Sequence, residues 1–479
     1  MPDTELLFMS ATKAAALIRR KKLSPLEYVD AVLSAVDRLQ PKLNCFVTVT
    51  AEQAREAAKA AEQAVMTGER LGPLHGIPVG VKDLLPTKGV RTTFGSVVFA
   101  DHVPDRDDVL VTRLRAAGAI MIGKTTTPEF GIKGQTDAPI FGVTRNPWKL
   151  ERTPGGSSGG AAAAVAAGVG PIGLGSDGAG STRIPAACCG LVGLKGTTGA
   201  VPYQEARDAF GNVIAAGPLT RTIADCAVMQ AALGGGDPMD PWTANAAPIG
   251  NLAPALLSQD LSGVRIGYLS RSAAPKVSVD VLKGVRASLD VFAHLGADVE
   301  EINVDIDWMS EHQRALYLSS IANNLGSVVE RFGDKTDRVL RAYVAAGKKY
   351  DIAAYIAAIN ARTRLFRAIQ GLFETYDFLV SPTVTRTALD VDFDGAASIV
   401  EVDGEPVGPA QPAFTGFVYP FNLTGHPALA VPSGWGTDGL PTSVQIIGPR
   451  HGDSGVLRLG ALLEQARPWA DRKPALASL

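Results

Sequence analysis

One segment of the chain, residues 155–199, is unusually rich in glycine. It holds 14 glycines in 45 residues, whereas 51 glycines in 479 residues would give roughly five. Because glycine adopts conformations that other residues avoid, this density indicates a backbone held in unusual geometry. The most apolar part of the region, Ala161–Leu174, is shorter than the roughly 20 residues that a membrane-spanning helix needs. We therefore expect no membrane span here.

Length, charge and cysteine content exclude several classes of protein. With 479 residues and 46% hydrophobic side chains the chain can form a large core, which excludes a small disulfide scaffold. The formal net charge is −2, without long runs of like charge, so neither nucleic acid nor an anionic membrane is an expected partner. The cysteines form no CxxC pair and no cluster with histidine, and the N-terminus lacks the basic start and apolar run of a secretory signal. We therefore expect a cytoplasmic protein. The cysteines are Cys45, Cys188, Cys189 and Cys226.

Helical and strand patterns alternate along the first part of the chain, which predicts a mostly parallel sheet. Capping residues Ser10 and Ser24 each begin a helix, and the first 70 residues are expected to form helices. The other expected helices are 51–66, 107–117, 277–295, 339–373 and 454–466. The expected strands are 77–83, 119–125, 378–384, 428–432 and 443–447.

Three sequence elements carry the chemistry, and together they resemble the amidase signature family. They are Lys82 in a Val-Lys-Asp strand end, TPGGSSGG at 153–160, and GLGSDGAGSTRIPAACCGLVGLK at 173–195. The family pattern joins such a lysine to a Gly-Ser-rich loop and to a second serine further along, in an Asp-x-Gly-Gly-Ser turn. The resemblance covers roughly residues 5–235 and about 412–470. The region between these two segments resembles the family only in its length.

The resemblance implies a role for each reactive side chain. Ser181 would be the nucleophile, Ser157 the bridging serine after a cis peptide bond, and Lys82 the base. A lysine removes a proton only when it is neutral, and at its ordinary pKa about 0.04% is neutral at pH 7. Burial among apolar strand residues is expected to lower the pKa of Lys82, with the carboxylate of Asp83 turned away.

The turn before the nucleophile is expected to form an oxyanion hole from the backbone amides of Gly178, Ala179, Gly180 and Ser181. The family usually has glycine at both positions before the nucleophile, whereas this chain has Ala179 and Gly180. If the first position requires a positive φ, Ala179 adds strain of about 1 kcal/mol, or Gly178 takes the turn instead. Asp177 and Arg183 are expected to form an ion pair that braces this loop.

The resemblance also implies the fold and the assembly. We expect an α/β/α layered fold with a large central mixed twisted sheet flanked by helices, in a single domain over residues 1–479. Its core would be about 1–235 and 412–479, and 236–411 would be a variable substrate-specificity region. Neither a metal nor an organic cofactor is expected, the partner is a small-molecule amide, and a homodimer is the implied assembly.

The expected reaction is hydrolysis of a carboxylic amide to an acid plus ammonia or an amine, with esters as a side activity. A few aromatic residues would line an apolar site that favours aryl or aliphatic amides. The candidates are Trp308, Tyr317, Phe332, Tyr343, Tyr350, Tyr355, Phe414, Phe417 and Tyr419.

Several other interpretations remain to be separated. Within the family, the alternative is the glutaminase (A-type) subunit of a tRNA-dependent amidotransferase, although GLKGTTGAVP at 193–202 favours a free-standing amidase. Gly156–Gly160 also fits the G-x-S-x-G elbow of an α/β-hydrolase, with Ser158 as nucleophile and His426 or His451 as partner, but the charged segment NPWKLERTP, with its two prolines, stands where that elbow needs a strand. A penicillin-recognising S-x-x-K site at Ser10 and a nucleotide- or phosphate-binding module, suggested by glycine patterns at 118–125 and 173–178, are remote alternatives.

Overall fold

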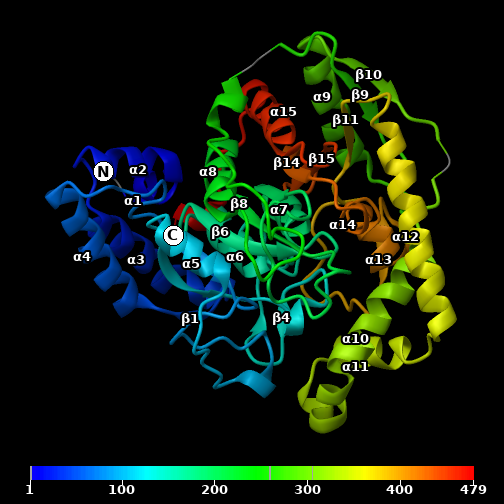
Figure 1. Cartoon of the computed structure of the whole chain (residues 1–479), viewed down its shortest axis with the longest axis horizontal. Coiled ribbons are helices and arrows are strands. Elements are labelled where there is room, and N and C mark those ends of the chain that lie inside the picture. The colour runs from blue at the N-terminus through cyan, green and yellow to red at the C-terminus, as the bar shows by residue number, and fades with distance from the viewer. Residues whose placement is uncertain (1–2, 258–259, 305, 479) are drawn as a thin grey trace.

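The computed structural model describes residues 3–257, 260–304 and 306–478, and a sheet of 11 strands runs through its centre (Figure 1). In order across the sheet, the strands are β1 (Phe46–Val49), β3 (Ile120–Thr125), β2 (Pro78–Lys82), β6 (Ile172–Asp177), β8 (Ala215–Thr220), β7 (Val192–Lys195), β14 (Ala428–Trp435), β15 (Pro441–Ile447), β11 (Phe378–Pro382), β9 (Arg265–Tyr268) and β10 (Asp298–Glu301). Two small two-stranded sheets are formed by β4 (Asp137–Ala138) with β5 (Gly142–Val143) and by β12 (Ile399–Val402) with β13 (Glu405–Pro409).

The central sheet is mixed, so the expectation of a mostly parallel sheet from the alternation of elements is wrong. Parallel pairing occurs at β3–β2–β6 and at β11–β9–β10. The pairs from β6 through β8, β7, β14 and β15 to β11 are antiparallel. One cause is visible at β14 and β15, because the short connection between them can join only antiparallel strands. The mixed sheet flanked by helices that the family resemblance implied is confirmed.

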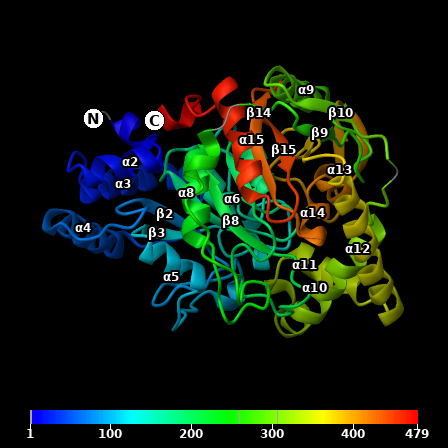
Figure 2. The ribbon, with the colours of Figure 1, turned by 45° about the horizontal axis from the view of Figure 1, so that its top comes forward.

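Helices cover both faces and both ends of the sheet. Figures 1 and 2 place the N-terminal helices α2 to α4 at one end of the molecule and α12 at the opposite end. The helices are α1 (Asp3–Leu7), α2 (Ala11–Arg19), α3 (Pro25–Leu43), α4 (Ala51–Thr67), α5 (Val109–Ala116), α6 (Gly159–Ala166), α7 (Arg183–Cys189), α8 (Ile223–Leu233), α9 (Val279–His294), α10 (Ser310–Phe332), α11 (Arg338–Gly347), α12 (Ile352–Leu372), α13 (Ala410–Thr415), α14 (Tyr419–Thr424) and α15 (Asp453–Ala466).

The alternation of side chains along β14 separates the two helical layers. Leu429 and Val431 pack in the core cluster that contains residues of α8, α9 and α15. Ala428 and Ala430, at the alternate positions of the strand, pack in clusters with residues of α7, α12 and α14. Successive strand residues point to opposite faces, so this single strand contributes to the cores on both sides of the sheet.

Two sequence-based expectations about secondary structure are wrong. Phe46–Val49 forms the edge strand β1, although only helices were expected in the first 70 residues. The helix expected over 339–373 is two helices, α11 and α12, and the side chain of Asp351 caps the second by accepting a hydrogen bond from the amide of Ala354. The expected caps are confirmed, since Ser10 and Ser24 accept hydrogen bonds from the first turns of α2 and α3.

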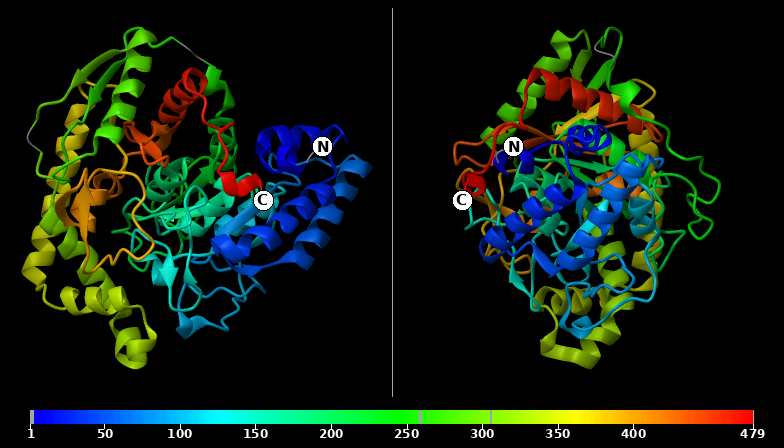
Figure 3. Two further views of the ribbon diagram at one scale, coloured as in Figure 1. Left: turned by 180° about the vertical axis from the view of Figure 1, so that it is seen from behind. Right: turned by 90° about the vertical axis from the view of Figure 1, so that its left-hand side faces the viewer.

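The middle of the chain is built into the central sheet, because β9, β10 and β11 all lie within 236–411. The expected boundaries of core and variable region stay a prediction. The two ends of the described chain lie on the same side of the molecule (Figure 3), where Leu476 packs in one cluster with Leu6 and Leu7. None of the described helices combines the length and the apolar character needed to cross a membrane.

Candidate active site

The carboxyl ends of the parallel strands β2 and β6 bring Lys82 and Asp177 to the same edge of the sheet. Lys82 is the last residue of β2, and its side chain is fully buried. Small residues in β6 let helix α6 approach closely. A side chain at Gly173 would stand 3.1 Å from Cβ of Ala161, and one at Gly175 would stand 2.8 Å from Oγ of Ser158. The loop before α6 is thereby held over the end of β2.

Four oxygen atoms surround the amine of Lys82. Nζ lies 2.7 Å from Oγ of Ser157, 2.9 Å from Oγ of Ser158 and 3.0 Å from Oγ of Ser176. The carbonyl oxygen of Ser176 lies 3.3 Å away. All of these oxygens are uncharged, so the amine has polar partners but no carboxylate among its hydrogen-bond contacts in the described chain.

This environment sets the protonation of Lys82. Burial lowers the pKa of Lys82 to about 7, and the charge of Asp177 partly opposes the shift. The expected effect of desolvation is confirmed. Asp83 points elsewhere, as expected, because its Oδ2 accepts hydrogen bonds from the amide and hydroxyl of Thr93. At neutral pH a large fraction of Lys82 is therefore the free amine that a base requires.

The three serines around Lys82 differ in what their hydroxyls can do. The Ser158 hydroxyl donates to the carbonyl of Ser176 at 3.2 Å and accepts from the amide of Ser176, which fixes it in place. The Ser157 hydroxyl contacts Lys82 and can donate its proton to a neutral amine. The Gly156–Ser157 peptide bond is cis, as the resemblance implied.

Ser181 occupies a different environment from the buried serines. It is partly exposed and lines a pocket together with Ala179. Its loop is organised by the carboxylate of Asp177, which accepts hydrogen bonds from the amides of Gly180, Thr182 and Arg183. Ser181 therefore reaches the pocket, whereas Ser157 and Lys82 are buried.

The predicted oxyanion hole needs one correction. The Gly180 amide donates to Oδ1 of Asp177 at 2.7 Å, so it is already engaged and we remove it from the set of donors. The backbone amides of Gly178, Ala179 and Ser181 remain candidate donors for the oxyanion hole. The expected strain at Ala179 is absent, because Gly180 has the positive φ of +103° and Ala179 does not. A side chain at Gly180 would also stand 2.5 Å from Val418, so glycine is required there on both counts.

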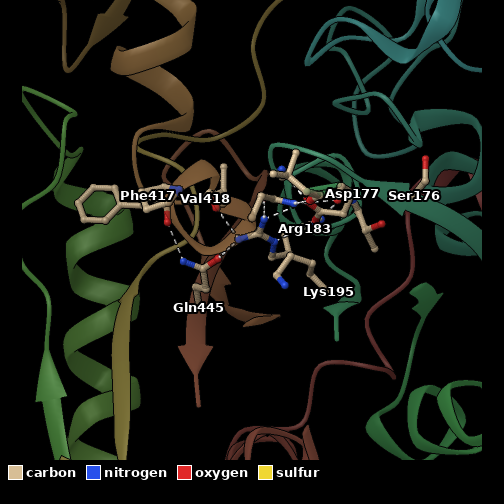
Figure 4. A network of polar contacts seen from close by, with 12 residues as sticks. Ser176, Asp177, Arg183, Lys195, Phe417, Val418 and Gln445 are labelled. Atoms are coloured by element: carbon tan, nitrogen blue, oxygen red, sulfur yellow. Dashed lines mark hydrogen bonds and ion pairs between the residues drawn. The ribbon is translucent and has the colours of Figure 1, made fainter. Parts of the chain in front are cut away.

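Arg183 ties the loop of Ser181 to the C-terminal part of the chain (Figure 4). Its guanidinium pairs with Asp177 through Nε and Nη2, both at 2.9 Å, which confirms the expected ion pair. It also donates to the carbonyl of Val418 at 2.9 Å and to Oε1 of Gln445 and Oδ1 of Asn422, both at 2.6 Å. Burial alone would raise the pKa of Asp177, but Arg183 holds it well below its usual value.

Sequence reasoning assigned no role to several of these residues. Ser176, Asn422 and Gln445 contact the site directly or through Arg183. Asn422 and Gln445 lie in YPFNLTGHPALAVPSG and PTSVQIIGPR, segments whose family resemblance was the available signal. Lys195, which is also buried with a pKa lowered by burial to about 7, donates to the carbonyl of Gly196.

The pocket beside Ser181 is lined by four of the nine predicted aromatic residues. These are Tyr317, Tyr343, Phe414 and Tyr419. The other five, Trp308, Phe332, Tyr350, Tyr355 and Phe417, do not line it. The remaining wall is formed by the segment 131–135 and by small or apolar residues, including Ile184, Leu389 and Ala410. The pocket is thus largely apolar and aromatic.

The structure contradicts the rival sites. Ser158 is fully buried, and no described strand directly precedes its loop, so it does not form a nucleophile elbow. His426 is held by Thr424 and Gln370. Ser10 is a helix cap, and the glycine patterns at 118–125 and 173–178 fall largely within strands β3 and β6 rather than in phosphate-binding loops. Within the described residues, no three His, Cys, Asp or Glu side chains gather in a way that could hold a metal ion.

Comparison with known proteins extends the likeness over nearly the whole chain. The Amidase family model matches residues 27–457. An acylamidase of Rhodococcus erythropolis is 37% identical over 485 residues, 99% of each chain. The A-type subunit of the glutamyl-tRNA(Gln) amidotransferase of Geobacillus kaustophilus is 35% identical, over 98% of this chain and 99% of its own. The crystal structure of a bacterial aryl acylamidase of the amidase signature family superimposes with a TM-score of 0.89 and 30% identity, covering 97% of both chains.

Proposed function

The chain belongs to the amidase family and hydrolyses carboxylic amides, and we propose that Ser181 is its nucleophile, with Ser157 and Lys82 as the proton relay. The observation that carries this proposal is the 2.7 Å contact between Nζ of buried Lys82 and Oγ of Ser157, close to a pocket into which Ser181 opens. A base, a relay hydroxyl and an accessible nucleophile are the parts that serine-dependent acyl transfer requires.

In the first half of the reaction, Oγ of Ser181 attacks the amide carbonyl. Its proton passes to Oγ of Ser157, and the proton of Ser157 passes to the neutral amine of Lys82. The negative charge that forms on the carbonyl oxygen is stabilised by the amides of Gly178, Ala179 and Ser181. One such donor typically contributes about 3–4 kcal/mol to transition-state stabilisation.

The second half regenerates the enzyme. The ammonium of Lys82 returns its proton through Ser157 to the leaving nitrogen, so the C–N bond breaks and ammonia or an amine departs. Water then attacks the Ser181 ester, with its proton following the same relay to Lys82, and the acid is released when Ser181 recovers its proton. Ser158 and Ser176 hold the amine of Lys82 in position during both halves.

For the substrate, we propose an aryl or aliphatic amide, with esters accepted as a side activity. The four aromatic side chains of the pocket support this proposal because they offer apolar surface to an acyl or aryl group. The glutaminase component of an amidotransferase remains the second candidate, supported by the 35% identity to the Geobacillus kaustophilus sequence. The two candidates are separated by measuring hydrolysis of anilides and of glutamine by the purified chain alone. A free-standing amidase should hydrolyse anilides without a partner and glutamine more slowly.

The cellular setting is also a proposal. Cys45, Cys188, Cys189 and Cys226 are all free and buried, which supports a cytoplasmic, reducing location. The homodimer and the single domain over 1–479 are supported by the family resemblance. Light scattering of the purified protein tests the first, and limited proteolysis tests the second.

The catalytic assignment is tested by labelling with a fluorophosphonate and mapping the modified peptide. We expect the label on Ser181, its loss in Ser181→Ala, and slow labelling in Lys82→Met and Ser157→Ala. The matched control is Ser433→Ala, a buried serine of β14 whose hydroxyl contacts Thr442, which should label at the wild-type rate. A label on Ser158, or unchanged labelling in Lys82→Met, contradicts the proposal.

A further inference from the structure

The segment 131–135 forms one wall of the pocket and includes a charged residue. Of the described residues that line the pocket, Lys133 is the single cation. The segment passes close to the catalytic serines, since a side chain at Gly131 would stand 3.3 Å from Oγ of Ser157. A side chain at Gly156 would stand 2.5 Å from the backbone nitrogen of Gln135. A charge on this wall therefore acts on whatever group is bound beside Ser181.

Lys133 is not free to receive a substrate carboxylate. Its Nζ lies 2.7 Å from Oδ2 of Asp137 and 2.7 Å from Oδ2 of Asp337. Only 6% of its side chain is exposed, and the side chain of Asp337 is 7% exposed. Burial alone would lower the pKa of Lys133, but the two carboxylates raise it above its ordinary value. Neither Asp137 nor Asp337 lines the pocket, so one ammonium with two carboxylates places a net negative charge directly behind this part of the wall.

The neighbouring charges do not reverse this balance. Glu129 accepts a hydrogen bond from the amide of Asp337 at 2.6 Å, and burial raises its pKa. Arg338, the residue after Asp337, pairs with Asp394. The charge of Arg314 acts to lower the pKa of Tyr343, but Arg314 does not line the pocket.

We propose that Lys133, with its ammonium paired to both Asp137 and Asp337, is a specificity-determining residue that excludes amides with a carboxylate in the acyl group and selects neutral acyl chains. A substrate carboxylate entering this pocket loses its water, finds the ammonium of Lys133 already paired, and meets the excess negative charge of the wall. A neutral alkyl or aryl chain suffers none of these costs. The inference rests on the proposed role of Ser181, because the acyl chain lies in the pocket only if Ser181 is the nucleophile that attacks its carbonyl.

The test compares two anilides that share a four-carbon acyl backbone and differ in charge. In 4-nitrobutyranilide the acyl chain ends in a methyl group, and in N-(4-nitrophenyl)succinamic acid a carboxylate replaces that methyl. Both release 4-nitroaniline, so kcat/KM is measured in the same way. For the wild type we expect the neutral anilide to be preferred by at least about tenfold. A ratio near one overturns the inference.

The double variant Asp137→Asn/Asp337→Asn removes two negative charges while keeping side chains of the same size. The asparagine introduced at position 337 can still cap α11, because it retains a side-chain oxygen that accepts from the amide of Val339. We expect the ratio to shift toward the anionic anilide by about tenfold. The matched control, Asp30→Asn/Glu330→Gln, removes two carboxylates from exposed ion pairs and should leave the ratio unchanged. An unchanged ratio in the pocket variant, or an equal shift in the control, overturns the inference.

Two further measurements keep the result interpretable. Asp137→Asn alone, at a carboxylate whose side chain is 34% exposed, replaces the double variant if that one does not fold, and a smaller shift in the same direction is expected. If neither anilide is cleaved, protection of Ser181 from fluorophosphonate labelling gives the same comparison, with stronger protection expected from the neutral compound. Anilide cleavage that survives Ser181→Ala refutes the proposed function itself, whereas a flat ratio with Ser181-dependent cleavage refutes only the role of Lys133.

Discussion

Two buried lysines lie near the same pocket, and their surroundings are opposite. Lys82 is enclosed by serine hydroxyls and one carbonyl, and its pKa is lowered by burial to about 7. Lys133 contacts two carboxylates at 2.7 Å, and its pKa is raised. Burial acts on both amines in the same direction, so the difference comes from the charge of the partners. Neutral partners leave a lysine able to exchange protons, whereas carboxylates keep it as a fixed ammonium.

The largest effect expected from this comparison is on catalysis. Lys82→Met should lower kcat for 4-nitrobutyranilide by about 10⁴-fold, because the serine relay then has no base. Initial rates under saturating substrate measure the change, with Lys348→Met, at an exposed lysine of a surface ion pair, as the control. If Lys133→Met lowers kcat as far as Lys82→Met does, the two lysines do not differ in role and the comparison fails.

The next effect is on stability and concerns Asp177, the carboxylate whose charge acts on Lys82. Asp177→Asn leaves Arg183 without its buried counter-ion, so we expect the free energy of unfolding to fall by about 3–5 kcal/mol. Urea unfolding followed by circular dichroism measures this. Asp30→Asn, which breaks an exposed ion pair, should change the stability by less than about 1 kcal/mol. Equal losses in the two variants would show that burial of the ion pair has no special consequence.

The pH dependence of the reaction tests the lowered pKa of Lys82 directly. In the proposed mechanism the neutral amine of Lys82 is the active form, so kcat/KM should be about half of its maximum near pH 7, level off above about pH 8 and fall as the pH decreases below 7. The fall approaches tenfold per pH unit at low pH, which amounts to about fiftyfold between pH 7 and pH 5. Lys195 also has a pKa near 7, so Lys195→Gln serves as the control and should keep the same acid limb. A limb that begins near pH 10 would mean that burial does not act on Lys82 as described.

The smallest effect concerns the backbone that carries Lys133. The hydroxyl of Tyr317 donates to the carbonyl of Ile132 at 2.5 Å, and Tyr317→Phe removes this hydrogen bond. We expect a loss of about 1 kcal/mol in stability and a change in KM with kcat nearly unaltered. Tyr376→Phe, where the hydroxyl contacts an exposed glutamate, is the matched control and should change neither. A fall in kcat as large as that of Lys82→Met would assign Tyr317 to the chemistry instead.

The difference between the two lysines also explains what the sequence could and could not predict. Lys82, Ser157 and Ser181 lie in local motifs, so their positions and the environment of Lys82 follow from short stretches of sequence. Lys133 lies in no recognised motif. Its partner Asp137 is four residues away, but its second partner, Asp337, is 204 residues away, and only the folded chain brings the three together. Ser176 was overlooked for a related reason, since a serine at the end of a strand has no distinguishing spacing.

The fold shows the same division between local and distant information. Helix caps such as Ser24 were predicted correctly because capping depends on a few neighbouring residues. The antiparallel centre of the sheet was not predicted, because it depends on pairing between strands such as β7 and β14 that are far apart in the sequence. The break between α11 and α12 was missed, because a continuous apolar pattern does not reveal a turn at which a second cap begins.

The contacts of Arg183 have a consequence for biosynthesis. A ribosome completes Lys82, Ser157 and Ser181 long before it adds Asn422 and Gln445, which hold the guanidinium next to the reactive loop. The emerging polypeptide therefore contains these three residues before the two side chains that hold Arg183 in place have been added. We therefore expect a product that ends before Asn422 to lack the hydrogen bonds from Arg183 to Asn422 and Gln445.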